Sequence, residues 1–130
     1  MYKPVVLLVD DEPDILSIYS RKLSESGFEV VTAENGLEAL KKARERRPDL
    51  VLLDFKMPVM DGIETIEAMK KDESLKDIKV VFLTAFSDPN VPEVDVRFSK
   101  QIGADDFIRK GLSLDELVEK VRSHLALPKT

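Results

Sequence analysis

The sequence contains no cysteine, only one histidine and no long hydrophobic run. Because cysteine is absent, disulfides and thiolate metal sites are excluded, and the composition fits the reducing cytoplasm. No apolar stretch approaches the roughly 20 residues that a transmembrane helix needs. The apolar residues 5–9 begin two positions after Lys3, and no small-residue cleavage site follows them, which argues against a signal peptide. We therefore expect a cytoplasmic protein without a membrane partner.

Positive charge is also too scattered to form a nucleic-acid-binding surface. The formal net charge is −5, and the 20 lysines and arginines are interspersed among 25 acidic residues. We therefore expect no direct nucleic-acid binding by this chain. The length of 130 residues, with 43% hydrophobic and 35% charged residues, is typical of one globular domain. We expect this domain to span residues 1–130, with residues 126–130 as a tail.

Short apolar runs alternate with helical patterns along the chain. The expected strands lie at residues 5–9, 28–33, 50–53, 80–83 and 107–108, and the second is more polar, as at a sheet edge. Helical spacing follows each strand, at residues 13–26, 35–47, 63–69, 94–102 and 113–125. This alternation predicts a five-stranded parallel sheet with helices on both faces. The fold class is therefore α/β, doubly wound, with three layers and right-handed crossovers.

Five polar residues stand where these strands end. Asp10 and Asp11 follow the first strand, Asp54 the third, Thr84 the fourth and Lys110 the fifth. The carboxyl ends of parallel strands share one edge, where open α/β sheets bind their ligands. Each residue alone has an ordinary explanation, because acids cap helices, threonines cap turns and lysines are usually solvated. No such role requires all five together, so the set predicts a functional site.

The residue types in this set indicate its chemistry. Carboxylates that lie close together repel, and a hard divalent cation such as Mg²⁺ relieves the repulsion. A carboxylate can also act as a nucleophile and form an aspartyl phosphate. The ammonium of Lys110 and the hydroxyl of Thr84 are suited to binding phosphoryl oxygens. No histidine or cysteine dyad is available, and we expect His124 to be a surface residue of the last helix.

These residues lie in motifs that resemble the receiver domain of bacterial two-component response regulators. The motifs cover nearly the whole chain: Val-Asp-Asp-Glu at 9–12, Leu-Asp at 53–54, Met-Pro-Val-Met-Asp-Gly at 57–62, Thr-Ala at 84–85, Gly-Ala-Asp-Asp-Phe at 103–107, and Lys110. The resemblance implies a flavodoxin-like strand order 2-1-3-4-5. It also implies a phosphorelay function, in which a histidine kinase or histidine phosphotransfer protein donates the phosphoryl group. The output partner stays open.

The resemblance assigns the acidic residues to the acceptor and the metal site. Asp54 would be the phospho-acceptor. Mg²⁺ would bind directly to Asp11, Asp54 and the backbone carbonyl of Lys56, and Asp10 would reach it through water. The protein would then catalyse its own phosphorylation and its own dephosphorylation, and it would not be a turnover enzyme.

The resemblance also implies roles for residues around the acceptor. Thr84 and Lys110 would bind the phosphoryl group. Phe107 would turn inward when Thr84 is drawn toward the phosphate, which makes these two residues the switch. Ile15 and Ile18, near the site, would form the docking patch for the kinase or phosphotransfer protein.

The sequence departs from the family pattern at two places. Members usually have a cis proline after the lysine, whereas Gly111 stands here. A cis bond without proline costs about 2.5–4 kcal/mol, so the path of the chain beside Lys110 is expected to differ. The segment between Thr84 and Lys110 is also longer than usual in the family, and the extra residues lie around 88–93. The sequence therefore does not establish that the fourth helix follows the family pattern.

Other functions remain open at this point. Phosphatases of the haloacid dehalogenase type also use a nucleophilic aspartate, but they need a second acid two residues later, where Lys56 stands. A flavin carrier of similar fold would need a hydroxyl-rich or glycine-rich loop after the first strand, and acids stand there instead. A third alternative is a receiver-like module that binds partners without being phosphorylated. The sequence also leaves open whether the domain stands alone or belongs to a longer protein.

Overall fold

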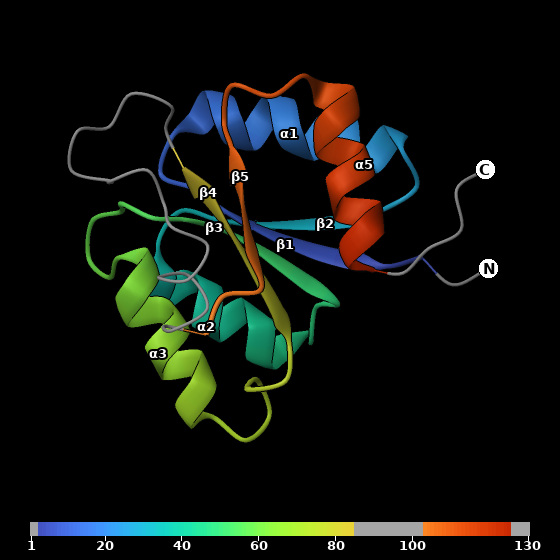
Figure 1. Ribbon diagram of the computed structural model, residues 1–130. Helices are drawn as coiled ribbons and strands as arrows, with labels where there is room; N and C mark the ends of the chain where they lie inside the picture. The colour runs from blue at the N-terminus through green and yellow to red at the C-terminus, as the bar shows by residue number, and fades with distance from the viewer. Residues whose placement is uncertain (1–2, 85–102, 126–130) are drawn as a thin grey trace.

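A parallel five-stranded sheet forms the centre of the computed structural model, which describes residues 3–84 and 103–125 (Figure 1). Its strand order is β2-β1-β3-β4-β5. The strands are β1 (Val5–Val9), β2 (Glu29–Ala33), β3 (Leu50–Asp54), β4 (Lys79–Thr84) and β5 (Asp106–Arg109). Both the predicted fold class and the predicted strand order are confirmed.

Helices cover both faces of the sheet, as the alternation of elements predicts. The described helices are α1 (Pro13–Glu25), α2 (Gly36–Glu45), α3 (Gly62–Lys71) and α5 (Leu114–His124). Figure 1 shows α1 and α5 on one face and α2 and α3 on the other. The helix expected at residues 94–102 and the long loop at residues 88–93 lie outside the described residues. In the part of the chain that is described, no helix is both long enough and apolar enough to cross a bilayer.

The buried strands explain the uninterrupted apolar runs of the sequence. All five residues of β1 and of β3 are buried, because both faces of each strand meet a helical layer. Successive residues alternate between two cores. Leu7, Val9, Val51 and Leu53 pack on the side of α2 and α3. Val6, Leu8, Leu50 and Leu52 pack on the side of α1 and α5.

The second strand is less buried than β1, β3 and β4, and its predicted start is wrong by one residue. As expected, β2 lies at an edge of the sheet, and four of its five residues are only half-buried. Phe28 was expected to belong to this strand, but the strand begins at Glu29. The amide of Phe28 instead donates to the carbonyl of Leu23 at the end of α1, and its side chain is buried. Phe28 therefore closes the helix rather than opening the strand.

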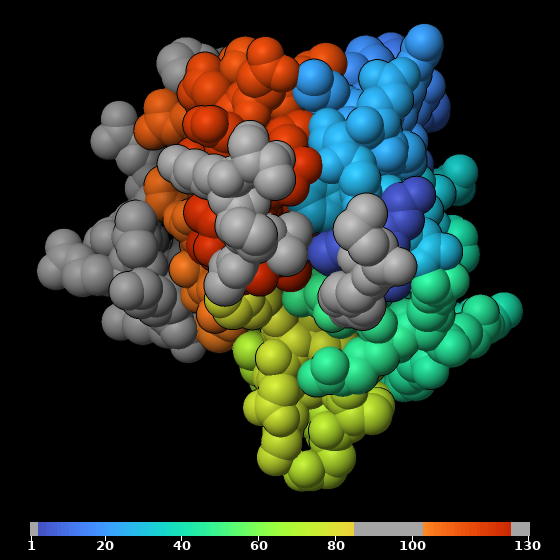
Figure 2. Space-filling model, turned by 90° about the vertical axis from the view of Figure 1, so that its right-hand side faces the viewer, coloured from blue at the N-terminus to red at the C-terminus, as the bar shows by residue number. Residues whose placement is uncertain are grey.

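The first and last helices are joined by polar contacts as well as by the core. Figure 2 shows α5 against α1 on the surface. Lys22 Nζ lies 2.9 Å from Asp115 Oδ1. Arg122 donates to the carbonyl of Ser26 at 2.7 Å, and its guanidinium carbon lies 5.3 Å from the centre of the Phe28 ring. These contacts fix the segment after β5 against α1.

The loop between β3 and α3 contains a strained residue. Val59 has a φ of 72°, a left-handed conformation that a β-branched side chain rarely adopts, and its side chain is 75% exposed. Asparagine tolerates this conformation, so we expect Val59→Asn to stabilise the fold by about 1 kcal/mol. Urea denaturation measures the change. Val59→Thr is the control, because it keeps the branched shape and should give no stabilisation. If the wild type, Val59→Asn and Val59→Thr have the same free energy of unfolding, the backbone at Val59 is not strained.

Candidate functional site

Four strand ends meet at one edge of the sheet, as the sequence predicts. Asp10 follows β1, Asp54 ends β3, Thr84 ends β4 and Lys110 follows β5. The register places these ends level, because Val9 pairs with Leu53, Asp54 with Leu83, and Thr84 with Arg109. Asp10, Asp54 and Thr84 are buried, although none of them is apolar. The buried polar groups of the described strands are therefore concentrated at the carboxyl edge of the sheet.

Three carboxylates form a cluster at this edge. One oxygen each from Asp10, Asp11 and Asp54 lies within 4.8 Å of the other two. Asp10 and Asp54 are buried, whereas Asp11 is exposed at the mouth. The Oδ1 atom of Asp10 accepts a hydrogen bond from the amide of Glu12 at 2.9 Å. Its other oxygen, Oδ2, is fully buried and accepts no hydrogen bond in the described part of the chain.

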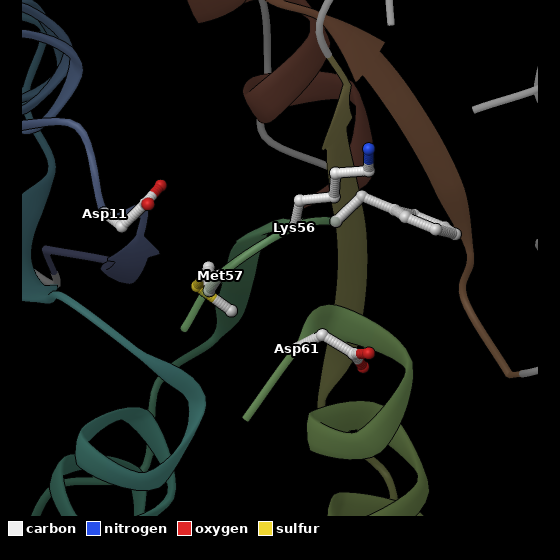
Figure 3. A pocket seen from close by; sticks show the side chains of 5 residues that line it. Asp11, Lys56, Met57 and Asp61 are labelled. Atoms are coloured by element: carbon white, nitrogen blue, oxygen red, sulfur yellow. The ribbon is translucent and has the colours of Figure 1, made fainter. Parts of the chain in front are cut away.

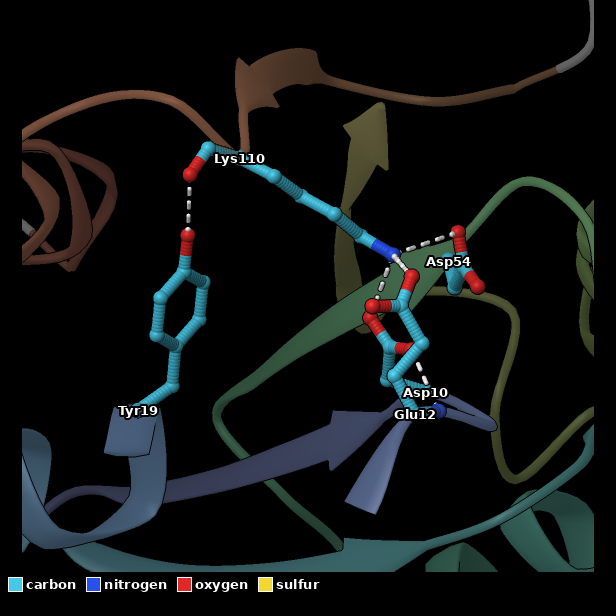
Figure 4. A network of polar contacts seen from close by, with 5 residues as sticks. All are labelled: Asp10, Glu12, Tyr19, Asp54 and Lys110. Carbon is cyan, nitrogen blue, oxygen red and sulfur yellow. Dashed lines mark hydrogen bonds and ion pairs between the residues drawn. The ribbon is translucent and has the colours of Figure 1, made fainter. Parts of the chain in front are cut away.

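A single ammonium group joins the acids (Figure 4). Lys110 Nζ lies 2.8 Å from Asp10 Oδ2, 3.0 Å from Glu12 Oε1 and 3.3 Å from Asp54 Oδ1. The contact with Asp10 Oδ2 is an ion pair between two largely buried groups, so the charge of this oxygen is compensated by the ammonium. The backbone of Lys110 is held at β4, because its amide donates to the carbonyl of Thr84 at 2.9 Å.

The acids and the lysine shift one another's protonation. Burial, followed by the charge of Asp10, raises the pKa of Asp54 to about 7, although Lys110 opposes the shift. Burial also raises the pKa of Asp10. Burial alone would lower the pKa of Lys110, but its contacts with Asp10, Asp54 and Glu12 raise it above the usual range. The lysine therefore stays charged, while the repulsion between Asp10 and Asp54 is only partly relieved.

An open pocket of about 470 Å³ adjoins the acid cluster. It is lined by Asp11, Phe55, Lys56, Met57 and Asp61. Figure 3 shows Asp11 on one side of the pocket and Lys56 and Asp61 on the other. The carboxylate of Asp61 begins α3, because it accepts a hydrogen bond from the amide of Glu64 at 2.8 Å. The pocket gives a ligand access to the exposed acid, Asp11.

Gly62 allows α3 to begin directly beside the end of β3. A Cβ atom at this position would lie 2.6 Å from the carbonyl oxygen of Asp54 and 2.9 Å from the ring of Phe82. The amide of Gly62 donates to the carbonyl of Phe55 at 3.0 Å, which closes the loop after β3. Only glycine permits this approach without displacing β3, which explains the residue at this position.

The remaining predicted residues lie around the cluster. Phe107 is half-buried and packs against the core on the side of α2 and α3. Ile15 is half-buried on α1, and Ile18 is 49% exposed. Lys56 is exposed and lines the pocket. None of these positions by itself tests the role that the resemblance implies.

Comparisons with known proteins agree with this arrangement. Residues 6–122 match the family model described as "Response regulator receiver domain". The chain belongs to the response regulator receiver family. A solved structure, the chemotaxis response regulator CheY4 of Vibrio cholerae, superposes with a TM-score of 0.84 at 31% identity, over 95% of this chain and all of CheY4.

Two curated relatives of this receiver domain differ in length. The transcriptional regulatory protein PrrA of Mycobacterium tuberculosis is 43% identical over 123 residues, which are 94% of this chain but 50% of PrrA. The response regulator DivK of Brucella anthropi is 34% identical over 120 residues, which are 92% of this chain and 94% of DivK. The chain thus spans about half of PrrA and nearly all of DivK.

The acid cluster of this receiver domain is compatible with Mg²⁺. Its three carboxylates supply the hard oxygen ligands that Mg²⁺ prefers, and few of them are needed. The buried carboxylates of Asp10 and Asp54 share one cation, Lys110, so their negative charge is only partly neutralised. The residues present therefore fit a divalent cation.

Two residues of the receiver domain site were not singled out in the sequence. Glu12 enters the sequence analysis only as the last residue of the Val-Asp-Asp-Glu motif, yet it contacts Lys110. Tyr19 lies within the predicted helix at residues 13–26, and its hydroxyl donates to the carbonyl of Lys110 at 2.8 Å. The residue type of Tyr19 was the available signal in the sequence, because a tyrosine at a buried helical position needs a hydrogen-bond partner for its hydroxyl.

The structure also bears on two features near the end of the receiver domain, the position of His124 and the peptide bond after Lys110. His124 was expected at the surface, but its side chain is 18% exposed, and Nε2 lies 2.8 Å from Asp106 Oδ2. It lies on α5 as predicted, turned toward β5. The described residues contain no cis peptide bond, so the chain between Lys110 and Gly111 is trans. This agrees with the absence of proline at position 111.

Proposed function

We propose that this receiver domain accepts a phosphoryl group on Asp54 and changes conformation in response. The observation that carries the proposal is the single ammonium of Lys110, which lies within 3.3 Å of both Asp10 and Asp54 at the carboxyl edge of the sheet. A nucleophilic carboxylate beside a fixed cation and further acids is suited to phosphoryl transfer, which depends on positioning and on charge neutralisation. The proposed unit is one domain over residues 1–130.

The proposed reaction transfers the phosphoryl group from a phosphohistidine. An oxygen of Asp54 attacks phosphorus in line with the P–N bond, the P–N bond breaks, and the imidazole nitrogen keeps the electron pair. The products are an aspartyl phosphate and a free histidine on the donor. Asp54 must be deprotonated to attack, and the charge of Lys110 favours that form.

The proposed metal ligands are Asp11, Asp54 and the backbone carbonyl of Lys56, with Asp10 acting through water. Support comes from the separation of at most 4.8 Å among the three carboxylates and from the single cation, Lys110, that Asp10 and Asp54 share. When bound, Mg²⁺ would neutralise charge on the transferring phosphoryl group. Lys110 would exchange its contact with Asp54 for a phosphoryl oxygen, and the hydroxyl of Thr84 would donate to another.

Thr84 and Phe107 are the proposed switch. We expect Thr84→Ala to accept a phosphoryl group but to transmit it poorly, because the hydroxyl that would link the phosphate to β4 is lost. Only a few kcal/mol are needed to invert a two-state population. NMR of the Phe107 ring before and after phosphorylation measures the effect. Shifts at Phe107 in Thr84→Ala as large as those in the wild type would exclude this coupling.

The proposed partners follow from the reaction. A histidine kinase or histidine phosphotransfer protein would dock on α1 at Ile15 and Ile18, beside the acid cluster, in the cytoplasm. Ile18 supports this placement, because it is one of the few large apolar side chains that are exposed in the described part of the chain. The output partner is left open by this proposal.

The protein is proposed to be an acceptor and not a turnover enzyme. A phosphatase of the haloacid dehalogenase type would need an acid at position 56, and Lys56 stands there. Incubation with acetyl phosphate and Mg²⁺, followed by intact mass spectrometry, separates the alternatives. One added phosphoryl group per chain supports a receiver. Continuous release of phosphate without an adduct would indicate a phosphatase, and neither result would indicate a module that is not phosphorylated.

A further inference from the structure

Tyr19 connects α1 to the chain segment that carries Lys110. Its ring is buried, with 4% of the residue exposed, and its hydroxyl donates to the carbonyl of Lys110 at 2.8 Å. The two residues are 91 positions apart in the sequence. In Figure 4 the carbonyl of Lys110 faces Tyr19, while the side chain extends the other way, toward Asp10 and Asp54. One hydrogen bond therefore holds the backbone from which the ammonium reaches the acids.

The backbone of Lys110 is held on two sides. On one side its amide donates to the carbonyl of Thr84 at 2.9 Å, which continues the pairing of β4 with β5. On the other side its carbonyl accepts the hydroxyl of Tyr19. The next residue adds no packing, because a Cβ at Gly111 would have no atom within 4 Å. Glycine also has the freest backbone of all residues, so the chain needs an external contact to keep one path here.

A fixed backbone matters because the lysine side chain is long. Its ammonium must lie close to Asp10 and Asp54, at 2.8 and 3.3 Å, and small rotations of the backbone move its tip by much more. Transfer of a phosphoryl group depends strongly on such positioning. We propose that Tyr19 is a positioning residue, which aims Lys110 at the acceptor through the hydrogen bond to the Lys110 carbonyl. This proposal rests on the phospho-acceptor function proposed above.

The competing explanation is purely structural. A buried tyrosine needs an acceptor for its hydroxyl, and any nearby carbonyl would satisfy that need. Under this explanation, removal of the hydroxyl changes stability and nothing else at the site. The two explanations differ in whether a folded variant without the hydroxyl is phosphorylated more slowly than the wild type. They also differ in whether its affinity for Mg²⁺ falls together with the rate.

The test uses Tyr19→Phe, which removes the hydroxyl and keeps the buried ring. Ser26→Ala is the matched control, because the hydroxyl of Ser26, which directly follows α1, also donates to a backbone carbonyl, that of Lys22 at 2.7 Å, at the opposite end of α1 from the acid cluster. Three quantities are measured for the wild type and both variants: the melting temperature without metal, the affinity for Mg²⁺ by calorimetry, and the phosphorylation rate with acetyl phosphate at saturating Mg²⁺.

Positioning predicts a specific combination of results for Tyr19→Phe. The phosphorylation rate should fall about two- to tenfold, the range of one neutral hydrogen bond, while the rate of Ser26→Ala stays at the wild-type value. Mg²⁺ affinity should be unchanged or higher, because a less confined ammonium competes less for Asp10 and Asp54. A merely loosened site would instead weaken Mg²⁺ binding and phosphorylation together.

Two results would overturn the proposal. One is a phosphorylation rate of Tyr19→Phe within twofold of the wild type. The other is a loss of rate that is accompanied by an equal loss of Mg²⁺ affinity or that is matched by Ser26→Ala. If the wild type itself forms no adduct, the phospho-acceptor function fails, and that outcome is distinct from both. The melt without metal verifies that each variant is folded before its rate is compared.

Discussion

Asp54→Asn is expected to abolish phosphorylation and to leave the fold intact. The substitution is nearly isosteric, but the amide lacks the anionic oxygen that attacks phosphorus. Asp54 is buried at the end of β3, and the amide fits the same space. Intact mass spectrometry after incubation with acetyl phosphate and Mg²⁺ should show no adduct in the variant. Wild-type labelling of Asp54→Asn would move the acceptor to another residue, with Asp10 and Asp11 as the first candidates.

Asp61→Asn is the matched control for this experiment. Asp61 lines the same pocket and undergoes the same chemical change, but it is not part of the acid cluster. Its structural role is to cap α3, and asparagine caps helices about as well as aspartate does. The control should therefore be phosphorylated at close to the wild-type rate. Equal loss in both variants would indicate a general effect of charge at the pocket.

The second large effect is expected in the stability of the metal-free protein. The pKa of Asp54 is about 7 in the folded protein, compared with 3.8 as the ordinary value. Well below pH 3.8 the group is protonated in both states and does not affect stability. As the pH rises toward 7, the carboxyl group of Asp54 loses its proton in the unfolded chain before it does so in the folded protein. The free energy of unfolding therefore falls over this range. Above pH 7 the group is deprotonated in both states, and the free energy of unfolding falls no further on its account.

Asp54→Asn should remove this pH dependence. Urea denaturation without metal should find the variant more stable than the wild type, and the gain should be larger at pH 8 than at pH 5 by at least about 1 kcal/mol. The full shift of the pKa corresponds to roughly 4 kcal/mol, and coupling to Asp10 and Lys110 distributes part of it over those groups. A gain that is independent of pH would show that Asp54 is not the group that titrates.

Mg²⁺ should counteract the same repulsion. At ten times its dissociation constant, the ion should stabilise the wild type by roughly 1.4 kcal/mol, and Asp54→Asn should respond much less. Sodium chloride at matched ionic strength controls for screening. Equal melting temperatures with and without Mg²⁺ in the wild type would contradict the proposed metal site.

The sequence was most informative about the sheet and its carboxyl edge. Apolar runs that end in Asp10, Asp54, Thr84 and Lys110 allow only a few arrangements, because parallel strands present their ends on one side. The strand order was taken from the family resemblance and is confirmed. Asparagine and serine are typical helix-capping residues, and Asn35 and Ser113 do cap the helices that follow them. The apolar runs and the caps depend on residues close together in the chain.

Features that depend on distant residues were missed. Periodicity places Tyr19 on the buried face of α1, but it cannot indicate that the hydroxyl meets a carbonyl beyond β5. His124 was expected at the surface for the same reason, since its partner Asp106 lies on another element. The left-handed conformation of Val59 was missed because valine normally argues against it, and the loop geometry prevails over the preference of the residue.

The most direct test of the account is to locate the phosphoryl group on the chain. Hydride reduction converts an aspartyl phosphate into homoserine, which permanently marks the residue that carried the phosphate. The wild type is incubated with acetyl phosphate and Mg²⁺, reduced, digested and sequenced by mass spectrometry. Phosphorylation of Asp54 predicts homoserine at position 54 and nowhere else in the chain. Homoserine at position 10 or 11, or its absence from a protein that carries an adduct, would contradict it.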